Sequence, residues 1–215
     1  MSPEVRQYAV YALGAALVVY MLRRNLWRFL LFVKPTALEL EADAPADQMK
    51  LPAMLEKRQT DLLALGFVPL GTHLERAPLG GQLLSFDYGH PKELAFATLT
   101  ASNDNPRLYL FSRAGEAFVL TADYRRPAHE EKGRYLSGSL EGVSVERLFK
   151  AHQRRLAELG NATGTCTLEG RVDAGRAWLS GPGASETRQQ NLLGLLWTVG
   201  TVGMVAAAIF GRVKQ

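Results

Sequence analysis

One long uncharged segment constrains what this chain can fold into. Residues 191–211, NLLGLLWTVGTVGMVAAAIFG, contain no charged side chain. An α-helix rises about 1.5 Å per residue, so a helix of this length can cross roughly 30 Å of hydrocarbon. The segment predicts a transmembrane helix that Ser185 caps, and with its flanks it defines a C-terminal region at residues 184–215.

A second apolar segment, YAVYALGAALVVYML, starts at Tyr8 and is followed by RRNLWRFLLFV. Its uncharged core would form only about 22 Å of helix, so the neighbouring arginines are expected to snorkel to the headgroups. We interpret residues 1–35 as a transmembrane helix with an interfacial extension, ended by Pro35. A cleavable signal peptide is the alternative, and the absence of a small-residue cleavage site after the core disfavours it. The expected membrane-interface residues are Arg23, Arg24, Trp27, Arg28 and Lys34.

The remaining residues fit one soluble domain. Residues 36–50, TALELEADAPADQMK, are acidic and alanine-rich and predict a solvated tether, and residues 51–183 form the predicted domain. The net charge of +4 comes largely from basic residues that flank the apolar segments, which favours lipid headgroups as the partner and gives no support to nucleic acid. The single cysteine, Cys166, allows no intrachain disulfide and is expected to be a small buried hydrophobe.

The distribution of basic residues predicts the orientation, because Lys and Arg are retained on the cytoplasmic side of a membrane. Five basic residues flank the inner ends of the two apolar segments: Arg23, Arg24, Arg28, Lys34 and Arg188. Three flank the outer ends: Arg6, Arg212 and Lys214. The count predicts a two-span inner-membrane protein with a cytoplasmic domain and both termini outside. The second segment alone predicts the opposite orientation, because it has one basic residue at its inner end and two at its outer end.

The periodicity of the domain predicts an α+β fold. Pro52 and Gly66 bound an amphipathic helix at residues 52–65, and Ser144 and Gly160 bound another at residues 145–159. Between these helices apolar residues recur at about every second position, which is typical of strands. The connections between the expected strands are short, which predicts an antiparallel β-meander, and Gly115 is expected in a tight hairpin turn. The expected strands are residues 67–74, 82–88, 94–101, 107–113 and 117–122. Residues 161–183 are weakly patterned, with at most a short strand at 165–168. The predicted helices would cover one face of the sheet and leave the other solvated.

Residues 124–142, YRRPAHEEKGRYLSGSLEG, predict a long charged loop with, at most, one short extended piece. Its basic residues are interleaved with aromatics, a combination that suits phosphate, lipid headgroups or nucleic acid. Two glutamates inside the loop weaken the positive electrostatic field of these residues. The candidate anion- or headgroup-binding residues are Arg125, Arg126, His129, Lys132 and Arg134.

No catalytic, metal or cofactor site is expected. The four histidines fall on different predicted elements without an HExxH motif, and neither a G-x-S-x-G elbow nor a P-loop occurs. His152 lies on the apolar face of the second helix, where it is expected to be a core histidine that contacts the sheet.

Small residues recur at four-residue spacing in both apolar segments, which favours close helix packing in a membrane. The expected packing residues are Ala12 and Ala16 in the first segment and Gly203, Ala207 and Gly211 in the second. The partner would be the other segment, another membrane protein or a second copy of this chain.

These features favour a membrane-anchored, non-enzymatic binding or assembly module that acts through the exposed sheet face or the 124–142 loop. The alternative is a membrane-associated enzyme acting on a lipid or lipid-linked substrate, with Arg125, Arg126, His129 and His152 near its pocket. A self-associating pore is the third hypothesis. The layout, with the segments ALGFVPLG and LYLFSRAGEAFVLTADYRRP, is similar to that of bacterial membrane proteins, which implies a bacterial inner membrane and no particular function.

Overall fold

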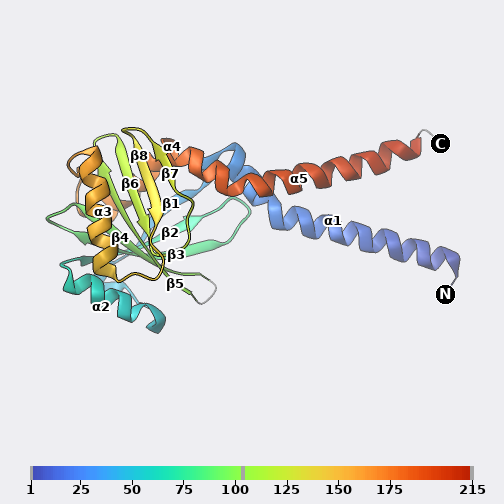
Figure 1. Ribbon diagram of the computed structural model, residues 1–215. Coiled ribbons are helices and arrows are strands. Elements are labelled where there is room, and N and C mark those ends of the chain that lie inside the picture. Colours follow the sequence, from blue (N-terminus) through green and yellow to red (C-terminus); the bar gives the residue numbers. More distant parts are fainter. Residues whose placement is uncertain (1, 103–104, 214–215) are drawn as a thin grey trace. The chain divides into compact units, whose positions relative to one another are not determined.

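The computed structural model describes residues 2–102 and 105–213, and the chain divides into two compact units. The helical unit consists of Met1–Ala37, Ala77–Gly80 and Ser185–Gln215. The α+β unit consists of Leu38–Arg76 and Gly81–Ala184. Figure 1 shows the helices and strands of both units.

Two helices among the described residues are long and apolar enough to cross a membrane: α1 (Pro3–Val33) and α5 (Gly183–Val213). The Ser2 side chain caps α1 by accepting a hydrogen bond from the backbone N–H of Val5. The most apolar window of α1 has no buried residue, and in α5 only 22% of that window is buried. The apolar surface of both helices is therefore largely exposed, unlike that of a helix in the core of a soluble protein.

Helices α1 and α5 lie in close contact at Gly194, where an added Cβ would lie 2.2 Å from the Cβ of Arg28. The buried face of α5 around Gly194 is polar and consists of Thr187, Asn191, Thr198 and Thr201. Asn191 donates a hydrogen bond to the carbonyl of Thr187, and Thr201 donates one to the carbonyl of Trp197. These bonds within the helix satisfy the side chains of Asn191 and Thr201, whereas the Thr198 hydroxyl is buried without a hydrogen-bond partner among the described residues.

The small residues expected to pack lie on other faces of these helices. Ala12, Ala16, Gly203 and Ala207 are exposed, and Gly211 lies outside the residues whose side chains are described. Packing of these residues against a second copy stays a prediction.

The described part of the α+β unit contains one eight-stranded sheet in the order β1-β2-β3-β4-β5-β6-β8-β7. All neighbouring strands are antiparallel except β6 and β8, which run parallel. The strands are β1 (Glu39–Pro45), β2 (Val68–Arg76), β3 (Gln82–His90), β4 (Ala95–Ser102), β5 (Asn105–Ala114), β6 (Ala117–Ala122), β7 (His129–Glu131) and β8 (Tyr135–Ser139).

The five strands and two helices expected from the sequence are confirmed within a few residues. Strands β2 to β6 form the meander, and Gly115 turns the β5–β6 hairpin with a positive φ of 61°. The first helix is α2 (Glu56–Ala64), preceded by a short 3-10 helix at Ala53–Leu55. The second is α3 (Val145–Leu159), and the Ser144 hydroxyl accepts a hydrogen bond from the Arg147 N–H, as its cap position predicts.

Three segments differ from the sequence-based expectation. Residues 36–50, expected to be a solvated tether, contain β1, which pairs with β2 along the sheet edge. Residues 124–142, expected to be mostly loop, contain β7 and β8. Strand β8 lies between β6 and β7, so the sheet is not purely antiparallel. The chain crosses back through β7, which supplies the length that a parallel connection needs.

The largest difference is the helix α4 (Leu168–Ser180), in a region where at most a short strand was expected. Thr167 caps it by accepting a hydrogen bond from the Gly170 N–H. Side chains of β4 and β5 alternate between two cores. Leu99 and Leu110 pack in the core that includes Leu148 of α3, and Phe96 and Phe111 pack in the core that includes Ala174 of α4. Helices therefore cover both faces of the sheet, which corrects the expectation of one solvated face.

The contact at Gly194 can be tested by adding bulk to it. Gly194→Val should lower the free energy of unfolding of the full chain in mild detergent by about 1–3 kcal/mol, the usual cost of overpacking. Gly203→Val is the matched control, because nothing lies within 4 Å of a Cβ at that position. Thermal unfolding followed by tryptophan fluorescence would measure both variants. Equal melting temperatures for the two would contradict the packing described.

Candidate functional site

The most strongly interacting polar groups lie inside the domain, between the sheet and α4. One ring nitrogen of His73 on β2 pairs with the Asp87 carboxylate on β3, and the other lies 3.4 Å from Glu75. The Thr98 hydroxyl donates to the second oxygen of Asp87 at 2.7 Å. His73, Asp87 and Thr98 are fully buried. The meander register places these three strands side by side, and the alternation along each strand directs the polar residues to one face.

Helix α4 contributes a buried cation, Arg171, to the same cluster. Its Nε lies 3.5 Å from Asp87 and donates to the Thr98 hydroxyl at 3.2 Å, and its Nη2 donates to the Tyr109 hydroxyl at 2.6 Å. Gly175, one turn further along α4, leaves the space, because a Cβ there would lie 2.9 Å from the Arg171 guanidinium. Removing one partner of such a buried pair typically costs about 3–5 kcal/mol, since the other charge stays buried. The cluster therefore fixes α4 to the sheet.

A second buried polar group lies on the α3 side of the sheet. The His152 Nε2 is 3.0 Å from the Ser112 hydroxyl, and its Nδ1 is 3.1 Å from the Thr121 hydroxyl. Ser112 and His152 have the spacing of a nucleophile and its base, but both are fully buried and no carboxylate orients the ring. Burial, reinforced by the Arg155 charge, lowers the pKa of His152 to about 3, so the imidazole is neutral. The expectation of a core histidine in contact with the sheet is confirmed.

The five basic residues of the 124–142 segment do not converge on one point. Arg125 and Lys132 are exposed, and Arg134 forms a 2.6 Å ion pair with Glu131. Arg126 and His129 are half-buried and take part in a different arrangement with aromatic side chains.

That arrangement is a row of six side chains in contact through their rings and guanidinium groups, which we call the cation–aromatic ladder. The Arg107 guanidinium lies 5.1 Å from the Tyr124 ring centre, and Arg126 lies 5.9 Å from the Trp178 ring centre. Arg126 also hydrogen-bonds the Tyr124 side chain, which joins the two pairs. Trp178 continues to Tyr135, with ring centres 6.0 Å apart, and Tyr135 continues to His129 at 5.7 Å. In sequence order the ladder is Arg107, Tyr124, Arg126, His129, Tyr135 and Trp178.

The ladder contacts the start of α5 through Trp178, which lies in the middle of the ladder. A Cβ at Gly183, the first residue of α5, would be 2.2 Å from the Trp178 indole, so only glycine fits there. The indole N–H of Trp178 is buried without a hydrogen-bond partner among the described residues. The ladder thus combines two guanidinium groups, an imidazole and an unpaired donor next to the helix that leads into the uncharged segment.

The sequence predicted two basic residues of the ladder, Arg126 and His129, but not Trp178 in its middle. Trp178 lies in the region considered weakly patterned, and Arg107 was counted only as the start of a strand. A signal was present, because Leu168, Val172, Gly175 and Leu179 follow Thr167 at helical spacing. The stacking itself joins residues far apart in the chain, so local pattern could not reveal it.

The expected interface residues of α1 lie along its second half. Arg24 donates a hydrogen bond to the Tyr20 hydroxyl at 3.1 Å, and the Arg28 guanidinium lies 5.5 Å from the Trp27 ring centre. Arg23 and Lys34 are exposed. Stacked arginine and tryptophan pairs suit the headgroup level of a membrane.

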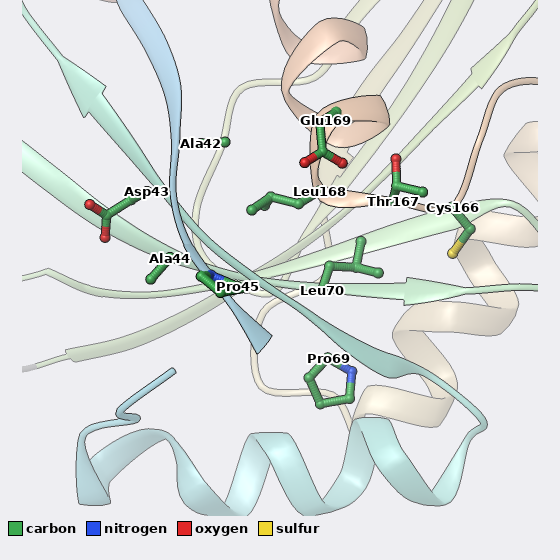
Figure 2. A pocket seen from close by; sticks show the side chains of 10 residues that line it. All are labelled: Ala42, Asp43, Ala44, Pro45, Pro69, Leu70, Cys166, Thr167, Leu168 and Glu169. Carbon is green, nitrogen blue, oxygen red and sulfur yellow. The ribbon is translucent and has the colours of Figure 1, made fainter. Parts of the chain in front are cut away.

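A shallow hollow lies between β1, the start of β2 and the start of α4. Figure 2 shows Leu70 and Leu168 in its middle, with Cys166 on one side and Asp43 on the other. Burial raises the pKa of the Cys166 thiol, which keeps it protonated and unreactive, and Asp43 accepts a hydrogen bond from Thr72. The hollow contains no activated nucleophile, and its lining carries no chemistry that we can assign.

Among the described residues, no group of three or more His, Cys, Asp or Glu side chains has the arrangement of a metal site. Comparison with protein-family models, with curated proteins and with solved structures gives no match to this chain. The function is therefore inferred from the positions and contacts of the residues.

The buried pair of His73 and Asp87 should make stability fall at alkaline pH. Burial alone would lower the pKa of His73, but the carboxylates of Asp87 and Glu75 outweigh it and raise the pKa above its ordinary value. The stabilisation is complete below the unfolded pKa of about 6.5 and is lost as the pH rises through the folded pKa. Denaturant unfolding of the full chain between pH 6 and 9 should show this decline, and His73→Gln should flatten it. An unchanged slope in the variant would contradict the assignment.

His152 should have the opposite effect at acidic pH. Its folded pKa of about 3 lies below the unfolded value, so below about pH 6.5 the unfolded chain binds a proton that the folded chain does not. Stability should fall as the pH drops from 6.5 to 4, and His152→Gln should remove that part of the slope while lowering stability at all pH values. The same unfolding measurement tests this, and a variant as steep as the native chain would exclude a buried neutral imidazole.

Proposed function

We propose that the protein is a membrane-anchored binding module, held by α1 and α5, whose domain binds an anionic group at the membrane surface through the cation–aromatic ladder. The anchoring is supported by the exposure of apolar residues along both helices: Tyr8 is 72% exposed, Leu13 73% and Leu193 61%. Exposed apolar surfaces of this extent mark membrane or protein contacts.

The links between the helices and the sheet are short. Residues 34–38 separate α1 from β1, and residues 181–182 separate α4 from α5. Five extended residues reach at most roughly 20 Å. The short links support a domain held near the headgroups, in place of one at the end of a long tether.

The ladder is the observation that carries the proposed binding activity. Asn191, the first residue of the uncharged segment, lies eight residues beyond Gly183 on α5, which corresponds to about 12 Å along the helix. Trp178 packs on Gly183, so the ladder contacts the first residue of the helix that contains the uncharged segment. Guanidinium groups are the side chains whose geometry best matches phosphate or carboxylate oxygens. A lipid headgroup and an acidic group of a neighbouring membrane protein both offer that chemistry.

The other hypotheses receive less support. The enzyme hypothesis places His152 near a pocket with Arg125, Arg126 and His129, whereas His152 is enclosed between α3 and the sheet. For a pore, the polar residues of α5 would have to face a lumen, but Thr198 and Thr201 are buried within the single chain. The bacterial inner membrane stays a proposal based on the resemblance of the layout to bacterial membrane proteins. The cytoplasmic domain and the external termini stay proposals based on the basic residues.

Trp178 fluorescence can test anion binding by the ladder. In a Trp27→Phe/Trp197→Phe chain, Trp178 is the only tryptophan. Its emission should shift in nanodiscs of anionic lipid and not in zwitterionic nanodiscs, and inorganic phosphate should cause a shift in neutral detergent. Arg126→Gln should weaken phosphate binding about tenfold, the value of one charge-assisted hydrogen bond.

Arg154→Gln is the matched control, because Arg154 is an exposed arginine on α3, outside the ladder. If the Trp178 emission wavelength changes neither with lipid charge nor with phosphate, anion binding by the ladder is refuted. A photo-crosslinker at Arg125 in native membranes distinguishes the sources: a crosslinked protein band assigns the anion to a protein partner, and crosslinked lipid assigns it to a headgroup.

A further inference from the structure

The turn between β2 and β3 has an exposed leucine at its tip. Residues 77–81, APLGG, carry no charge, and Leu79 is 75% exposed, the most exposed large apolar side chain described. Its φ of 57° lies in the left-handed region, which leucine rarely adopts. Glycine or asparagine would be the ordinary choice at such a position. The turn therefore holds a bulky apolar side chain in water at a conformational cost that nothing within the domain explains.

The turn also groups with the helices. The residues Ala77–Gly80 belong to the same compact unit as α1 and α5, whereas the strands on either side belong to the α+β unit. The exposed apolar faces of α1 and α5 therefore belong to the same unit as the Leu79 tip.

The residues that flank the tip have the pattern of a membrane-interface anchor. Arg76 immediately precedes it, with a side chain that is 42% exposed and 3.3 Å from Glu41. A cation at the base of an apolar tip lets the tip enter the acyl region while the charge stays at the headgroups. Two further leucines lie near the turn on the strands that it joins. Leu74 of β2 pairs with Leu84 of β3, and Leu84 is 40% exposed.

We propose that the β2–β3 turn inserts Leu79 into the lipid interface of the bilayer that α1 and α5 cross, as a third membrane contact. The proposal rests on the anchoring part of the proposed function and is independent of the ladder. Its occupant is lipid.

Hydroxyl-radical footprinting of the unmodified chain tests the insertion without any substitution. In water Leu79 would be modified more than Leu63, an α2 residue that is 44% exposed. In nanodiscs the order should reverse, with Leu79 modified several-fold less than Leu63. Leu192 and Leu193 of α5 report on the anchoring, because they are exposed in the chain and should be protected by lipid.

The outcomes separate the two ideas. Protection of Leu79, Leu192 and Leu193 together supports insertion. Protection of α5 with Leu79 modified at least as strongly as Leu63 overturns insertion and leaves the anchoring intact. Modification of Leu192 and Leu193 at the rate of Leu63 overturns the anchoring and the insertion with it. Spin-labelled lipids that quench a fluorophore on Leu79→Cys, in a Cys166→Ser chain, but not on Leu63→Cys, would confirm the depth independently.

Discussion

The buried contact of Arg171 with Asp87 determines how the rest of the domain is arranged. A guanidinium and a carboxylate removed from water are stable only while both are present and their remaining hydrogen bonds are satisfied. Thr98, Tyr109 and His73 supply those bonds. Helix α4 therefore has one position on the sheet. That position covers the second sheet face, brings Trp178 between Arg126 and Tyr135, and starts α5 against the ladder.

The strands and helices that were predictable from the sequence are those with a local signal. Alternating apolar residues defined β2 to β6, and Ser144 and Gly160 marked the ends of α3. Strand β1 was missed because ELEADAP is an edge strand whose only buried side chain is Leu40, so its composition is that of a tether. Helix α4 was missed because its buried face contains an arginine and a glycine. Their burial depends on strands that are distant in sequence.

The candidate site shows the same division. The basic loop was recognised from composition, and Arg126 and His129 do belong to the ladder. The aromatic partners that give these basic residues a defined place come from the segment after β6, from β8 and from α4, and only the tertiary structure brings them together. Conversely, Lys132 and Arg134 lie in the loop as expected but outside the ladder, where Arg134 pairs with a neighbouring glutamate. The density of basic residues in the sequence identified the 124–142 segment. The contacts with aromatic rings in the structure show which of its residues belong to the ladder.

We propose that α1 and α5 both cross the membrane, with the α+β domain on one side and both termini on the other. Single cysteines placed at Ser2, Arg125 and Gln215 of a Cys166→Ser chain can be labelled in intact cells with an impermeant maleimide. We expect the cysteines at residues 2 and 215 to be labelled, and the cysteine at residue 125 to be protected until the membrane is disrupted. Labelling of all three positions from one side, or loss of the residue 2 label through cleavage of α1, would contradict it.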